Sequence, residues 1–126
     1  KFARIVDGVT GTVAQRDYNL VLNTTLTPAQ AVNLVVEYNY LTGKILGFDG
    51  HFDDSGDCYQ YIYLYVANIN KVSDFYVIAE YYRTADGNST RTGNNFAVNI
   101  YSEERFKLQR DDWGRLDLVG LEISEQ

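Results

Sequence analysis

Four tyrosines stand at alternate positions of one short stretch, "DCYQYIYLYVAN" at residues 57–68. They are Tyr59, Tyr61, Tyr63 and Tyr65. Because successive side chains of a strand point to opposite faces, the four rings are expected to share one face of a sheet. Phenol rings can stack on sugars or peptide side chains, and their hydroxyls add directional hydrogen bonds. The stretch is therefore a candidate binding face.

A second tyrosine-bearing run, "FYVIAEYY" at residues 75–82, is expected to form the neighbouring antiparallel strand. A loop at 69–72 would set these residues opposite each other: Tyr59 and Tyr82, Tyr61 and Glu80, Tyr63 and Ile78, and Tyr65 and Tyr76. A register shifted by one residue stays open, because details of the turn decide the register. The shared tyrosine face either stabilises the sheet through cross-strand aromatic pairs or contacts a ligand or partner.

The other face of the first stretch is expected to be the hydrophobic core, and it carries Cys58, Gln60, Ile62, Leu64 and Val66. Cys58 is the one cysteine of the chain, so no internal disulfide can form and a small buried side chain is expected. The tyrosine face is then either a second buried layer or a platform that meets water.

An acidic, glycine-containing loop precedes the tyrosine stretch and holds Asp49, Asp53, Asp54 and Asp57. Several carboxylates on one loop are the ligands that a hard cation such as Ca²⁺ requires, so the sequence predicts a calcium site. The spacing does not match an EF-hand loop, and a solvated acidic turn is the alternative. A zinc site is not expected, since His51 is the one histidine.

Trp113 lies in the turn-forming segment "RDDWGR" at 110–115. It either closes the open end of a sandwich or serves as an exposed anchor for a ligand. The chain shows no supported nucleophile–histidine arrangement, phosphate loop or dinucleotide motif. Glu37 and Glu80 could form a glycosidase pair of carboxylates, but nothing singles them out. The sequence therefore predicts binding without catalysis.

The overall charge argues against two classes of partner. A net charge of −6 and a pI of about 4.6 disfavour nucleic acid and anionic membranes, because both are negatively charged. No stretch approaches the roughly 20 apolar residues of a membrane-spanning helix.

Asn23 and Asn88 each begin an N-x-Ser/Thr sequence, which favours a secreted or extracellular protein. The chain has no methionine, so a processed product or an excised domain is expected.

Runs rich in β-branched and aromatic residues recur along the chain, with turn-forming clusters between them. Besides the two tyrosine runs, they lie at 11–23, 95–101 and 115–123, and turn clusters include 84–95 and 110–114. This spacing predicts one all-β domain over residues 1–126, a single antiparallel β-sandwich of jelly-roll type with about eight strands.

Residues 28–42 fit two different structures. Thr27, Pro28 and Gln30 match the start of a helix, and Gly43 matches its end. Apolar residues also alternate through the segment, and its β-branched and aromatic content favours a strand. We therefore expect a turn at Thr27 and Pro28 followed by a strand.

Two functions follow from these features. The first is a non-catalytic, lectin-like module that binds carbohydrate, with Ca²⁺ as its candidate cofactor. Its candidate ligand-binding residues are Tyr59, Tyr61, Tyr63, Tyr65, Tyr76, Tyr82 and Trp113. The second is a structural subunit of an extracellular or viral assembly, a filament or coat, in which copies of the chain bury tyrosine faces and proline-free sheet edges between them.

Overall fold

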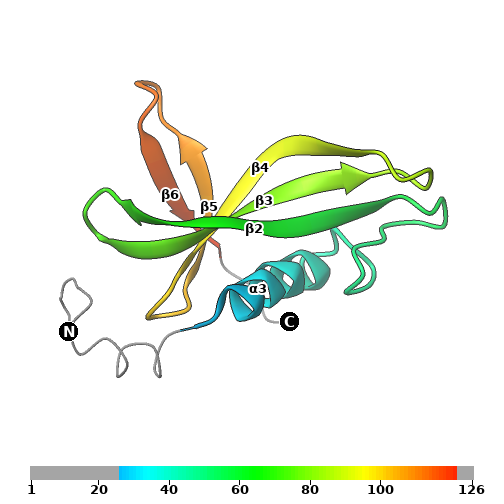
Figure 1. Ribbon diagram of the computed structural model, residues 1–126, viewed down its shortest axis with the longest axis horizontal. Coiled ribbons are helices and arrows are strands. Elements are labelled where there is room, and N and C mark those ends of the chain that lie inside the picture. Colours follow the sequence, from blue (N-terminus) through cyan, green and yellow to red (C-terminus); the bar gives the residue numbers. More distant parts are fainter. Residues whose placement is uncertain (1–25, 122–126) are drawn as a thin grey trace.

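A computed structural model describes residues 26–121 of the chain. Its elements, in chain order, are α3 (Pro28–Leu41), β2 (Cys58–Ile69), β3 (Ser73–Arg83), β4 (Ser89–Asn99), β5 (Arg105–Arg110) and β6 (Leu116–Gly120), as Figure 1 shows. The strands form one open antiparallel sheet in the order β2-β3-β4-β5-β6, so each strand pairs with its neighbour in sequence. The strand expected at 11–23 lies outside the described residues.

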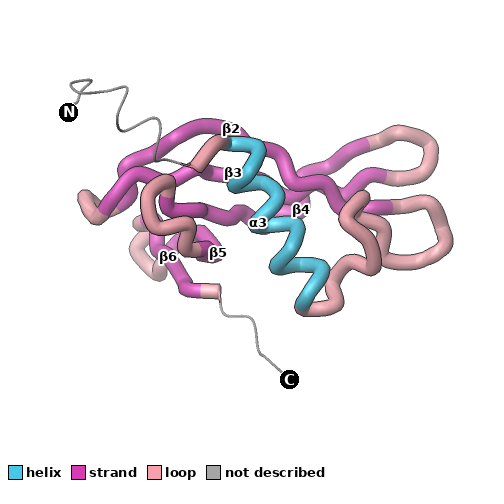
Figure 2. The backbone as a smooth tube through the Cα atoms, turned by 90° about the horizontal axis from the view of Figure 1, so that it is seen from below, coloured by secondary structure: helices cyan, strands magenta, loops and turns pink. Residues whose placement is uncertain are grey.

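The expected mostly-β fold is confirmed, but a sandwich of about eight strands is not shown. Residues 26–121 contain a single sheet of five strands, and a helix instead of a second sheet covers one of its faces. Figure 2 shows α3 lying across the strands on that face. No helix in the described part of the chain is long and apolar enough to cross a membrane.

The strand expected over 28–42 is wrong, because this segment forms α3. The Thr27 hydroxyl accepts a hydrogen bond from the backbone N–H of Gln30 at 3.1 Å, and the Gln30 side chain accepts one from Thr27 N–H at 2.9 Å. This reciprocal capping box satisfies two backbone donors that a helix otherwise leaves unpaired. The buried helix residues are Ala31, Val35, Val36 and Asn39, which lie on one side of a helix and on both sides of a strand.

The main hydrophobic core lies between α3 and the sheet. The helix contributes Ala31 and Val35, which are fully buried. The sheet contributes Tyr61, Tyr76, Ile78, Phe96 and Val98 from its three longest strands. The core therefore gathers on the face that carries the first tyrosines of β2. The expectation that the opposite face of β2 forms the core is wrong, since Ile62 there is 43% exposed.

A second cluster fills the opposite face of the sheet and joins Ile69, Phe75, Val77, Ala97 and Leu108. The sheet curls around this cluster, and Figure 1 shows β5 and β6 turned away from the direction of β2 and β3. The side chain of Asn70, just after β2, donates a hydrogen bond to the carbonyl of Leu116 in β6 at 3.1 Å. The curled sheet thus brings its two outer strands into contact at one end.

The pairing of β2 with β3 changes register once. Tyr59 faces Tyr82, Tyr61 faces Glu80 and Tyr63 faces Ile78, as predicted from the sequence. An irregularity between Tyr63 and Tyr65 then shifts the register by one residue. Each of the two registers left open by the sequence therefore holds for part of the strand.

Candidate functional site

The β2 irregularity divides the tyrosine stripe between the two faces of the sheet. Tyr65 pairs with Val77, a member of the cluster on the far face, and not with Tyr76. Tyr59 and Tyr61 remain on the face covered by α3, where they belong to or pack against the main core. The prediction of one continuous tyrosine face is therefore wrong, because a bulge reverses the alternation of side chains.

Two of the candidate binding tyrosines are buried by the helix. The Tyr61 hydroxyl donates to Glu80 Oε2 at 2.8 Å, and the Tyr76 hydroxyl donates to the Leu26 carbonyl at 2.6 Å. Burial raises the pKa of both phenols, and the hydrogen bond to Glu80 adds to the rise in the pKa of Tyr61. Tyr63 packs edge-on against Tyr76 with 5.6 Å between ring centroids. These rings stabilise the core.

A partly buried aromatic cluster joins Phe52, Tyr59 and Tyr82 at the start of β2. Lys44 Nζ lies 4.6 Å from the centroid of the Tyr59 ring. The Tyr82 hydroxyl donates to Asp57 Oδ2 at 2.6 Å, and this hydrogen bond raises the pKa of Tyr82 to about 12. The cluster ties the acidic loop to the sheet.

Glu80 of β3 is fully buried and ionised at the centre of a polar network. Its Oε2 accepts from Lys44 Nζ at 2.6 Å and from Tyr61, and its Oε1 accepts from Thr92 at 2.7 Å and Asn94 at 2.9 Å. Burial raises the pKa of Glu80, but the four hydrogen bonds outweigh it and hold the pKa below its ordinary value. Both oxygens are committed to protein donors, which makes Glu80 a structural centre.

The four aspartates predicted to bind calcium are not gathered around one point. Asp49 bonds the His51 ring at 2.7 Å, Asp53 bonds the Ser55 hydroxyl at 2.6 Å, and Asp57 bonds Tyr82. These hydrogen bonds from His51 and Ser55 lower the pKa of Asp49 and Asp53. Within residues 26–121 no three His, Cys, Asp or Glu side chains form a group that could hold a metal ion. Calcium binding stays a prediction.

Trp113 is 78% exposed at the tip of the turn between β5 and β6, so it does not close the end of a sandwich. Asp111 shapes this turn by accepting hydrogen bonds from the backbone N–H groups of Trp113 and Arg115, each at 2.9 Å. The guanidinium of Arg115 lies 5.4 Å from the centroid of the indole ring. The ring is therefore held on the outside of the molecule.

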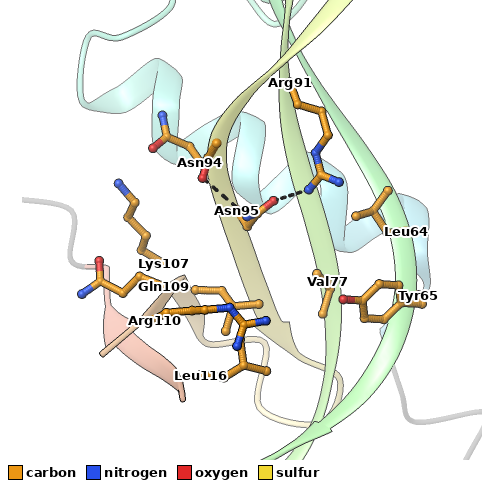
Figure 3. Close-up of a pocket in the computed structure, with 12 residues that line it drawn as sticks. Leu64, Tyr65, Val77, Arg91, Asn94, Asn95, Lys107, Gln109, Arg110 and Leu116 are labelled. Atoms are coloured by element: carbon orange, nitrogen blue, oxygen red, sulfur yellow. Dashed lines mark hydrogen bonds between the residues drawn. The ribbon is translucent and has the colours of Figure 1, made fainter. Parts of the chain in front are cut away.

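A groove of about 520 Å³ lies on the face of the sheet opposite α3. It is lined by Leu64, Tyr65, Val77, Arg91, Gly93, Asn94, Asn95, Lys107, Leu108, Gln109, Arg110 and Leu116. Val77 and Leu108 belong to the second hydrophobic cluster, which gives the groove an apolar floor. Figure 3 shows Arg91, Asn95, Arg110 and Tyr65 turned toward the same space, whereas Lys107 and Gln109 point away from it.

A bulge in β4 forms one wall of this groove. Ala79 of β3 pairs with Asn95, and Tyr81 pairs with Arg91, so three residues of β4 stand opposite Glu80. The middle one is Gly93, whose φ of +94° is a conformation that favours glycine. Thr92 and Asn94, on either side of Gly93, both donate to the Glu80 carboxylate. The buried network therefore holds the bulge in place.

Two arginines in the groove are held by neutral groups. Arg91 Nη2 donates to Asn95 Oδ1 at 2.7 Å, and its guanidinium lies 5.8 Å from the centroid of the Tyr81 ring. Arg110 Nη1 donates to the carbonyl of Gly114 at 2.7 Å. Tyr65 presents a ring that is 54% exposed. The groove thus combines an aromatic ring, an apolar floor and two positively charged forks.

Of these groove residues, sequence reasoning found only Tyr65. The others come from all five strands, β2 to β6, and only the folded sheet brings them together. The segment 84–95 was expected to be a turn, whereas residues from Ser89 onward form β4, so the strand position of Arg91 was missed. A strand signal was present in the alternation of Phe106 and Leu108 with polar residues in β5. Comparisons of the chain with protein-family models, with curated proteins and with solved structures found no match.

Proposed function

We propose that this protein is a non-catalytic binding module that takes carbohydrate in the groove. The observation that carries the proposal is the exposed ring of Tyr65 beside an apolar floor and the side chains of Arg91, Asn95 and Arg110. Sugars present an apolar C–H face together with hydroxyls. An aromatic ring packs against the C–H face, and guanidinium and carboxamide groups form hydrogen bonds with the hydroxyls.

The test compares Tyr65→Ala with Tyr40→Ala on a glycan array and then by calorimetry. Tyr40 is a matched control, because it is an exposed tyrosine of α3 on the other side of the sheet. The wild type and Tyr40→Ala are expected to bind the same glycans, and Tyr65→Ala is expected to weaken binding about tenfold or more, in line with the stacking contribution of a ring. The absence of any glycan that binds the wild type would refute the proposal.

Trp113 is a second candidate contact for the same ligand. The turn that carries Trp113 also holds Arg110, through the bond from Arg110 to the Gly114 carbonyl. A longer glycan that leaves the groove past Arg110 would meet this turn. Trp113→Ala should therefore weaken binding of long oligosaccharides more than binding of short ones.

The exposed side chains of β2 support a second candidate function, self-association as a structural subunit. Ile62 and Val66 are 43% and 49% exposed, and within residues 26–121 the strand β2 is an outer strand of the sheet. A second copy could pair with this edge and bury both side chains. Analytical ultracentrifugation over a wide range of concentration tests the idea: the wild type should form dimers or larger species that Ile62→Lys abolishes. A strict monomer would exclude it.

Secretion and calcium binding belong to the same proposal. Asn88 is exposed in the turn between β3 and β4, where an attached glycan would not clash with the core. Mass spectrometry of the protein from its source should then find a glycan on Asn88. Calorimetric titration with Ca²⁺ tests the acidic loop, and an unchanged melting temperature with no heat of binding would exclude a calcium site.

A further inference from the structure

The charge in the groove differs in sign from the charge of the whole chain. The chain carries −6, yet none of the residues that line the groove is acidic. Arg91 and Arg110 both line it, whereas the side chain of Lys107 at its edge points away from it. Among the described residues, no carboxylate lines this groove.

The two arginines also differ in their contacts from three basic residues that form ion pairs in the described chain. Lys44, Arg105 and Arg115 each pair with a carboxylate, those of Glu80, Glu37 and Asp111. Within the described residues, Arg91 and Arg110 instead bond a carboxamide and a carbonyl oxygen. A neutral acceptor orients a guanidinium without neutralising its charge.

This arrangement leaves each arginine ready for an anion. A guanidinium has five N–H donors in a planar fork, and each arginine uses one nitrogen for its bond to the protein. The fork matches two oxygens of a carboxylate or sulfate, and charge-assisted bonds of this kind are about twice as strong as neutral ones. Because the side chains are already oriented, less rotamer entropy is lost when the anion binds.

We propose that the groove selects carbohydrates with acidic substituents, a uronic acid carboxylate or a sulfate ester. Tyr65 and the apolar floor contact the sugar ring, and Arg91 and Arg110 bind the anionic oxygens. This inference rests on the proposed carbohydrate binding, because it names the class of sugar that the same groove takes. It adds the requirement that the sugar carries a negative charge, which contacts with Tyr65 and the apolar floor do not impose.

The experiment measures binding by calorimetry for three oligosaccharides of equal length: a neutral one, one built from uronic acids and one that carries sulfates. At least one of the two acidic oligosaccharides should bind at least about tenfold more tightly than the neutral one, as expected for charge-assisted pairs. The uronic and sulfated arms distinguish the two anions. Raising the salt concentration should weaken binding of the acidic oligosaccharides and leave the affinity for the neutral one unchanged.

Substitutions assign the effect to the groove. Arg91→Gln and Arg110→Gln should each lower the affinity for the acidic oligosaccharide about tenfold, and the affinity for the neutral one less than about twofold. Arg83→Gln is the matched control, because Arg83 ends β3 outside the groove and is exposed, and it should change neither affinity. Arg91→Lys keeps the charge but loses the fork, so it should fall between the wild type and Arg91→Gln. Melting temperatures report whether each variant folds.

The outcomes separate this inference from the proposed function. If the neutral probe binds as tightly as the acidic ones and needs Tyr65, the acidic selectivity is wrong and carbohydrate binding stands. If Arg83→Gln weakens the acidic probe as much as Arg91→Gln does, the attraction is not located in the groove and the inference is wrong. If no oligosaccharide binds, or a single-stranded oligonucleotide binds the groove more tightly than every sugar, both proposals fail.

Discussion

At the scale of the residue, Glu80 has the most demanding environment in the described chain. A buried carboxylate is tolerated only when donors replace the water that it loses, and four side chains do so here. Lys44 is the one charged donor among them and remains partly exposed. The free-energy cost of removing charge from water therefore falls mainly on Glu80. The network also fixes the three neighbouring strands β2, β3 and β4 relative to one another.

Removal of one donor should be measurable. Tyr61→Phe deletes the hydroxyl that bonds Glu80 and keeps the ring, so the free energy of unfolding in urea is expected to fall by about 2 kcal/mol. Tyr63→Phe is the control, because the Tyr63 hydroxyl has no hydrogen-bond partner among the described residues. Equal stability of the two variants would show that the Tyr61 bond contributes little.

The lowered pKa of Glu80 predicts a loss of stability in acid. Because the pKa is lower in the folded state than in the unfolded chain, the ionised carboxylate stabilises the fold above the unfolded value of about 4.3. That contribution disappears as the pH falls through the folded pKa. The free energy of unfolding should therefore fall with pH in this acidic range for the wild type, and less steeply for Glu80→Gln. Parallel pH profiles would contradict the assignment.

At the scale of the element, irregular pairings decide which side chains reach the groove. The β2 irregularity moves Tyr65 to the far face, and the β4 bulge builds the groove wall from Thr92, Gly93 and Asn94. Bulges of this kind bend a strand and redirect its side chains. The regular alternation of the sequence would place Tyr65 under or beside the helix instead.

Gly93→Ala tests the β4 bulge. A β-carbon at φ +94° is strained, so we expect a loss of about 1–2 kcal/mol in the free energy of unfolding and a weaker affinity for the groove ligand. Gly120→Ala is the matched control, because Gly120 has an ordinary φ and no atom within 4 Å of an added β-carbon. Full binding by a folded Gly93→Ala variant would mean that the bulge does not shape the site.

At the scale of the whole molecule, the curl of the sheet creates the groove. The second hydrophobic cluster draws β5 and β6 over the far face, and the bond from Asn70 to the Leu116 carbonyl joins the β2 end to β6. The groove lies on this far face, is lined by residues of all five strands and carries both arginines. Its width therefore depends on contacts between residues that are distant in the chain.

Asn70→Gly tests this closure, since glycine tolerates the φ of +55° found there. Lys71→Gly is the control for backbone entropy, because Lys71 has a φ of +60° in the same turn and is exposed. The free energy of unfolding in urea should fall by about 0.5–1 kcal/mol more for Asn70→Gly than for Lys71→Gly. It should also weaken ligand binding, which Lys71→Gly should leave intact.

Several local features were predictable from the sequence. The β2 and β3 strands and half of their register followed from alternating aromatic and β-branched residues. The turn at 110–114 followed from its aspartates and glycine, and Asp111 N–H bonds the Arg115 carbonyl there. The capping residues of α3 were visible too, but the competing alternation of apolar residues favoured the wrong structure. Only packing of Ala31 and Val35 against the sheet settles that choice.

The sequence by itself determined a β-rich chain with a negative net charge and tyrosines on alternate positions, because side-chain preferences and period-two patterns act locally. The tertiary structure alone decided which tyrosines are buried, that Glu80 stands at the centre of a polar network, and that Arg91 and Arg110 share a groove. Those outcomes depend on a bulge, a helix packed on one face and a curled sheet. Each of these joins residues whose separation along the chain carries no local signal.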